Sequence, residues 1–125
     1  MISISLEQLL ELHVLVIEST GGSSSLRDIG RLEAAIATQS QNVFGEELYP
    51  GVVNKAAAMI RGIIADHPFV DGNKRTAMLS GLTLLNLNQV KVKFHVGEIE
   101  NFAVDIATKH LDVTEIAQWL KSHTS

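Results

Sequence analysis

The stretch HPFVDGNKRT, residues 67–76, separates two apolar segments near the middle of the chain. Pro68 cannot donate a backbone hydrogen bond and disfavours helix at His67, so this stretch is expected to begin as a loop. From Asn73 to about Asn88 the sequence predicts a helix that is apolar nearly all round. Its apolar residues include Ala77, Met78, Leu82, Leu84, Leu85 and Leu87. Since such a helix is usually buried, the sequence predicts a loop that leads into a central helix.

Five other segments have helical spacing. Ser5 and Gln8 form a capping box at the start of a helix that ends near Ser19, before the glycine- and serine-rich residues 21–25. Asp28 is placed to cap a second helix. Further amphipathic patterns predict helices over residues 52–65, 98–110 and 113–123. The sequence therefore predicts an all-α fold, a compact single domain over residues 1–125 with about six helices around one buried helix.

Two segments are predicted to be non-helical. Residues 42–51 contain Gly45, Pro50 and Gly51, which favour an irregular loop. Residues 90–94 alternate apolar residues with lysines, which favours a short extended segment at most.

The composition excludes several classes of protein. The net charge of −4 argues against nonspecific nucleic-acid binding, which needs a basic surface. The absence of cysteine excludes disulfides and thiolate zinc sites. The N-terminal apolar stripe includes Glu7 and Glu11 and lacks the basic start of a signal peptide. We therefore expect a cytoplasmic protein without direct nucleic-acid or membrane partners.

Residues 67–76 combine the groups needed for chemistry on phosphates. The entrance of a helix offers free N–H groups, and Gly72 lets a ligand approach the backbone. Lys74 and Arg75 add positive charge suited to phosphate oxygens. Asp71 is an oxygen ligand of the kind Mg²⁺ prefers, and a neutral His67 could accept a proton from an attacking hydroxyl. Together these groups favour phosphoryl or nucleotidyl transfer.

Each of these residues alone also has an ordinary structural interpretation. His67 could cap the preceding helix, Asp71 could cap the next one, and Lys74 and Arg75 could form a solvated face. A metal site of His and Asp residues would need further ligands. His95, His110 and His123 stand apart in the sequence. The ordered set as a whole favours the functional interpretation.

Residues 67–75 resemble the signature H-x-F-x-[D/E]-[A/G]-N-[G/K]-R of the Fic/Doc family and match every fixed position. The similarity is greatest to the death-on-curing (Doc) toxins of toxin-antitoxin modules, and the chain length and helix pattern agree. The resemblance implies that His67 is the general base, Phe69 anchors the loop in the core and Asp71 holds Mg²⁺. It implies that Gly72, Asn73 and Lys74 line an anion cradle and that Arg75 binds phosphate.

Two departures from the family pattern bear on the activity. Members that transfer AMP typically have a second arginine three residues after the first, where this chain has Met78, and commonly a glycine where it has Lys74. The resemblance to Doc therefore implies transfer of the γ-phosphoryl group of Mg-ATP to a hydroxyl of a target protein. It implies further that the target is a translation elongation factor and that its modification arrests growth. AMP transfer and a catalytically inactive binding module remain alternatives, although the intact His67 argues against the latter.

The resemblance also implies a protein partner. Many family members carry a self-inhibitory motif [S/T]-x-x-x-E-[G/N], but here Ser3 and Glu7 are followed by Gln8. We therefore expect an antitoxin that inhibits in trans, through a segment that folds into an apolar groove. Leu9 and Ile116 are candidate walls of that groove, although core packing is the more ordinary role for each of them. Residues 42–51 are the candidate segment for docking the target.

Overall fold

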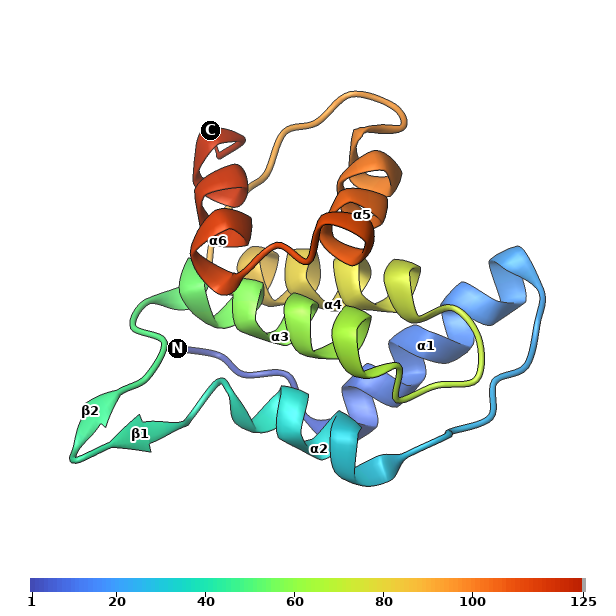
Figure 1. The fold of residues 1–125 in the computed structure, drawn as a ribbon, viewed down its shortest axis with the longest axis horizontal. Coiled ribbons are helices and arrows are strands. Elements are labelled where there is room, and N and C mark those ends of the chain that lie inside the picture. The colour runs from blue at the N-terminus through green and yellow to red at the C-terminus, as the bar shows by residue number, and fades with distance from the viewer. Residues whose placement is uncertain (125) are drawn as a thin grey trace.

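The computed structural model describes residues 1–124, which form six helices and one small hairpin (Figure 1). The helices are α1 (Leu6–Thr20), α2 (Ile29–Ala37), α3 (Val52–Asp66), α4 (Asn73–Leu87), α5 (Glu98–Lys109) and α6 (Val113–Ser122). The all-α fold predicted from the sequence is confirmed, with helix ends close to the predicted ones. No helix in this part of the chain is long and apolar enough to cross a membrane.

Two helices, rather than one, occupy the centre of the fold. α3 and α4 lie side by side, with α1 and α2 on one side of the pair and α5 and α6 on the other (Figure 1). The residues predicted to face inward from α3 are all fully buried: Ala56, Met59, Ile60 and Ile63. α4 is buried as expected, although Thr76 and Ser80 place two hydroxyls in its buried face. α3 shares the centre because α2, α4 and α6 all pack against it.

The helix ends follow local sequence signals. Ser5 caps α1 and Asp112 caps α6, each in a reciprocal capping box with the residue three positions on. Asp28 caps α2 by accepting a hydrogen bond from the Arg31 amide at 3.1 Å. The prediction for Ser5 and Asp28 is therefore confirmed, because a cap depends only on neighbouring residues.

Residues 42–51 are more ordered than their composition suggested. β1 (Asn42–Val43) and β2 (Glu46–Glu47) form an antiparallel hairpin, so the prediction of an irregular loop was wrong here. Phe44 and Gly45 connect the strands with positive φ angles of 51° and 82°. The turn lacks the Asn-Gly or Asp-Gly pair that usually signals such a hairpin. Residues 90–94 contain no strand, and Val92 forms only an isolated bridge with Thr124.

Gly81 allows α3 and α4 to approach closely. A Cβ atom at this position would overlap the Cδ1 and Cγ1 atoms of Ile60. Ile60 is itself fully buried in the core, so its side chain has no free space into which to rotate. The glycine therefore sets the distance between the two central helices.

We predict that Gly81→Ala lowers the free energy of unfolding by about 1–3 kcal/mol through overpacking. Gly62→Ala is the matched control, because its Cβ would meet the Ala35 Cβ at 3.2 Å. The control should stay within about 1 kcal/mol of the native protein, since alanine also favours the helix. Urea unfolding of both variants measures the difference, and equal stability of the two would contradict the packing argument.

Candidate active site

The loop over residues 67–72 joins α3 to α4 and carries three of the predicted site residues, His67, Asp71 and Gly72. His67 ends α3 in a left-handed conformation, with φ 48° and ψ 61°, and its backbone N–H donates to the Ile63 carbonyl at 3.1 Å. This conformation is uncommon for a residue other than glycine, and such residues cluster at functional sites. The His67 side chain is half-buried, whereas Asp71 is exposed.

The segment between α1 and α2 pairs with this loop. The Arg27 and Asp28 amides donate to the Pro68 carbonyl at 2.7 and 3.0 Å, and the Val70 amide donates to the Ser25 carbonyl at 3.1 Å. Sequence reasoning treated residues 21–25 only as a flexible loop and missed this pairing. No side-chain pattern could have indicated it, because the contacts are between backbone groups far apart in the chain.

The same segment orients the Asp71 carboxylate. The Ser23 amide donates to Asp71 Oδ2 at 2.8 Å. Gly22 lies against it, since a Cβ there would stand 3.1 Å from Oδ2. The bond holds the carboxylate beside the start of α4.

Asn73 closes the loop from the helix side. Its Nδ2 donates to the Phe69 carbonyl at 2.9 Å, and its Oδ1 accepts from the Phe69 amide at 3.0 Å. Both polar ends of the side chain are thus engaged with the loop. An anion-binding role for Asn73 therefore falls to its backbone N–H and not to its side chain.

The N-terminus of α4 is open. Its N-cap is Gly72, with φ 77°, and no side chain caps the helix. A Cβ at Gly72 would lie 3.2 Å from Ile17 Cδ1 on α1, so both the conformation and the packing favour glycine. Lys74 and Arg75 are exposed, and neither forms an ion pair with any residue that the structure describes. Free amides and unpaired cations at one helix end favour an anionic ligand.

Phe69 lies in the core beneath the loop, in the position that the family resemblance implied. Its ring stacks on the ring of His13 from α1, with centroids 3.6 Å apart and an interplanar angle of 11°. Nδ1 of His13 shares a hydrogen bond of 2.8 Å with the hydroxyl of Thr76 in the first turn of α4. Burial lowers the pKa of His13, an effect that the nearby Asp71 charge only partly opposes.

His13 occupies an inward position of α1, between the buried residues Leu9 and Val16. The available signal was its polarity: a histidine occupies an inward position among leucines and valines, where a buried imidazole needs a partner. The sequence could not show that this partner is Thr76, 63 residues further along the chain.

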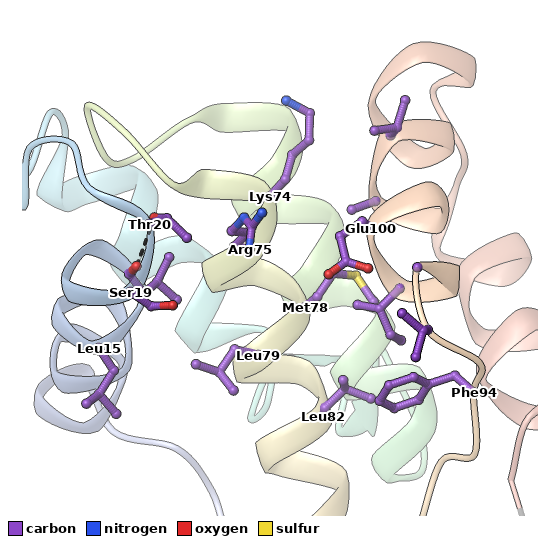
Figure 2. A pocket seen from close by; sticks show the side chains of 16 residues that line it. Leu15, Ser19, Thr20, Lys74, Arg75, Met78, Leu79, Leu82, Phe94 and Glu100 are labelled. Carbon is purple, nitrogen blue, oxygen red and sulfur yellow. Dashed lines mark hydrogen bonds between the residues drawn. The ribbon is translucent and has the colours of Figure 1, made fainter.

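A groove of about 630 Å³ runs beside the site, between α1, α4 and residues 94–104. Figure 2 shows Leu15, Leu79 and Phe94 among its apolar walls, with Lys74 and Arg75 at one end. Leu9 and Ile116 are fully buried, so their interpretation as core residues is confirmed and neither forms a wall of the groove. Helical spacing identifies apolar faces, but it does not show which of them remains uncovered.

The hairpin lies away from the loop. Figure 1 places β1 and β2 beside the N-terminal end of α3, whereas the loop with His67 follows its C-terminal end. The 15 residues of α3 span roughly 22 Å at 1.5 Å per residue. A segment that docks the target was expected to lie near the motif, but residues 42–51 do not. The segment that adjoins the motif is the one between α1 and α2.

Comparison with known proteins agrees with this geometry. The sequence profile of the Fic/DOC family matches residues 3–85, which include the whole signature and its supporting helix α1. The chain belongs to the Fic/Doc family. It is 38% identical over 99 residues to a protein named Toxin Doc from Mycolicibacterium smegmatis, covering 78% of this chain and 76% of the relative. It is 35% identical over 118 residues to the protein named Protein kinase doc of Escherichia phage P1, covering 94% and 92%.

Membership of the Fic/Doc family confirms the resemblance drawn from residues 67–75, and the six-helix fold is consistent with the all-α Fic/Doc fold. The structure brings the signature residues together at one end of the α3–α4 pair. Their chemical roles remain predictions.

We predict that Asn73→Ala lowers the free energy of unfolding by about 1–3 kcal/mol, because it leaves the partly buried amide and carbonyl of Phe69 without partners. Asn54→Ala is the control, since Asn54 makes one exposed hydrogen bond, to the Pro50 carbonyl. It should cost less than about 1 kcal/mol. Thermal unfolding measures both losses. An equal loss of stability in the two variants would contradict the stabilising role of the Asn73–Phe69 hydrogen bonds.

Proposed function

We propose that this Fic/Doc protein is the toxin of a toxin-antitoxin module that transfers the γ-phosphoryl group of Mg-ATP to a hydroxyl side chain of a target protein. The observation that carries the proposal is the open N-terminus of α4 with its unpaired Lys74 and Arg75, next to the loop with His67 and Asp71. The names of the two relatives, a toxin and a protein kinase, support it.

In the proposed reaction the target hydroxyl oxygen attacks the γ-phosphorus, the bond to the β,γ-bridging oxygen breaks, and ADP leaves. His67 accepts the hydroxyl proton. The α4 amides, Lys74 and Arg75 hold the phosphate oxygens. Such reactions depend mainly on positioning and on neutralising phosphate charge.

Asp71 fits the Mg²⁺ that this reaction requires. Its Oδ2 accepts the Ser23 amide, and its Oδ1 has no partner among the described residues. Mg²⁺ is commonly bound by one or two carboxylates together with substrate phosphates and water. The ion would neutralise phosphate charge, and the Ser23 hydrogen bond would keep the carboxylate turned toward the α4 N-terminus.

Met78 favours γ-phosphoryl transfer over AMP transfer. Its side chain is 2% exposed and belongs to the core, so it supplies neither a charge nor a hydrogen-bond donor to the cradle. AMP transfer would require the cradle to hold the β,γ-pyrophosphate as a leaving group, with more negative charge to neutralise. Burying charge without a partner is costly, and the γ-phosphoryl pose requires less of the cradle.

We propose further that a translation elongation factor is the target, following the resemblance to Doc, and that an antitoxin inhibits the enzyme in trans. The groove beside α4 is the surface suited to the antitoxin. Its walls are mainly apolar and its end carries Lys74 and Arg75, which fits an amphipathic helix with an acidic end. The exposed Val104 and Val96 would contact the apolar face of that helix.

We predict that cell extract incubated with this protein and Mg-ATP gains label from the γ-phosphate of ATP and none from the α-phosphate. One labelled band is expected, with the mass of a translation factor. Label from the α-phosphate, or a target heavier by a whole nucleotide, would show that AMP transfer is the activity.

The control for this experiment is His67→Ala. Removal of a general base should reduce the labelling rate by roughly 10²–10⁴-fold. Circular dichroism should show a folded variant, because the backbone of His67, rather than its side chain, caps α3. Undiminished labelling by the folded variant would refute the role of His67 as base.

We predict that Val104→Asp abolishes inhibition by the antitoxin and leaves the toxin active. Val104 is 47% exposed on the wall of the groove, so a charge there should be tolerated by the fold but not by an apolar partner. Val14→Asp is the matched control, because Val14 is 44% exposed but does not line the groove.

Each variant is expressed with and without the neighbouring open reading frame, and growth is measured. Co-expression should rescue cells with the native toxin or Val14→Asp, but not cells with Val104→Asp. Rescue of all three would exclude the groove as the inhibitory surface.

A further inference from the structure

His13 of α1 contacts both parts of the motif, the loop over residues 67–72 and the first turn of α4, from the core side. On the loop side its ring stacks on Phe69, which lies two residues from both His67 and Asp71. On the helix side its Nδ1 shares a hydrogen bond with Thr76, which directly follows Arg75. No other side chain within residues 1–124 makes both of these contacts.

Packing alone does not explain a histidine at this position. The His13 side chain is 1% exposed, and its Nε2 has no hydrogen-bond partner among the described residues. A buried polar atom without a partner is destabilising, and such atoms call for a specific explanation. Phenylalanine has a similar shape and would stack on Phe69 without this cost, although it could not bind Thr76.

The ring of His13 is also packed against the start of α4. A Cβ at Gly72 would lie 3.5 Å from His13 Cε1, which shows that the ring lies directly against the turn where α4 begins. Burial lowers the pKa of the ring and so favours its neutral form, an effect that the Asp71 charge only partly opposes. A neutral ring can stack on Phe69 while it exchanges a hydrogen bond with Thr76.

We propose that His13 is a positioning residue that fixes the Phe69 ring against the first turn of α4 and thereby sets the distance between His67 and the anion-binding end of that helix. Its action complements that of Asn73, which holds the backbone of Phe69, whereas His13 holds the ring. Small errors in the position of reacting groups reduce rates strongly, so a contact beneath the loop can control turnover without touching substrate.

The test is His13→Phe. This variant keeps the stack on Phe69, removes the bond to Thr76 and removes the unpartnered nitrogen. The Thr76 hydroxyl can then bind a carbonyl of its own helix. We expect an equal or higher Tm, together with a kcat at least tenfold lower and an unchanged KM for ATP. A packing role predicts the opposite, namely that activity is retained wherever stability is retained.

A second variant approaches the same contact from the helix. Thr76→Val removes the hydroxyl at nearly constant shape and should lower kcat as His13→Phe does. The double variant should be no slower than the slower single variant, because both changes break one interaction. Ile116→Val, a core change in α6 away from the motif, is the control for lost stability and should keep the native kcat.

Hydrogen exchange provides a measure that does not depend on the reaction. The amides of Phe69 and Val70 should exchange faster in His13→Phe and in Thr76→Val than in the native protein or in Ile116→Val. Native exchange and native kcat in folded His13→Phe would overturn the proposal. If that variant does not fold, the same two results in Thr76→Val would overturn it.

The inference rests on the proposed function only for the kinetic measurements. If the native protein transfers AMP rather than the γ-phosphoryl group, the kcat comparison is made with that activity and the proposed function alone fails. If the native protein transfers neither, the exchange rates still decide whether His13 positions the loop.

Discussion

The two hydrogen bonds between the Asn73 side chain and the backbone of Phe69 are the interaction on which the rest of the site depends. Pro68 makes the chain leave α3, and Gly72 lets it enter α4, but neither residue fixes the path between them. The Asn73 side chain fixes this path because it supplies hydrogen bonds to the Phe69 amide and carbonyl, which have no backbone partner in the loop. His67 and Asp71 lie on the loop that these bonds close, whereas Lys74 and Arg75 follow on the helix. One amide side chain thus couples the two groups of site residues.

The parts of the structure that could be predicted from the sequence are those that depend on near neighbours. The caps at Ser5 and Asp28, the loop at Pro68 and the buried faces of α3 and α4 follow from local spacing and local hydrogen bonds. The pairing of residues 22–28 with the loop does not, because it joins backbone groups through contacts of long sequence separation. The sequence left two roles open for Leu9 and Ile116, core or groove wall, for a related reason: periodicity marks an apolar face but not the element that covers it.

The candidate site could be singled out in the sequence because its polar residues are concentrated within residues 67–75. His13 could not, because its contacts involve a partner 63 residues away and a stacking geometry that no pattern encodes. The buried face of α4 shows the same compromise between packing and polarity, since Thr76 lies in it and binds His13. The His13–Thr76 pair places polar atoms in the core beneath the loop, where the Nε2 atom of His13 without a partner has a cost in stability.

The groove and the proposed anion site share Lys74 and Arg75, and this arrangement limits how a partner could inhibit the enzyme. An acidic residue of a helix in the groove would meet both cations at its end (Figure 2). The same cations are the ones that would hold the phosphates of ATP, so the partner and the nucleotide would compete for them directly. Inhibition would then need no change in the packing of α3 against α4. It would weaken as ATP concentration rises, because the two ligands would bind overlapping positive charge.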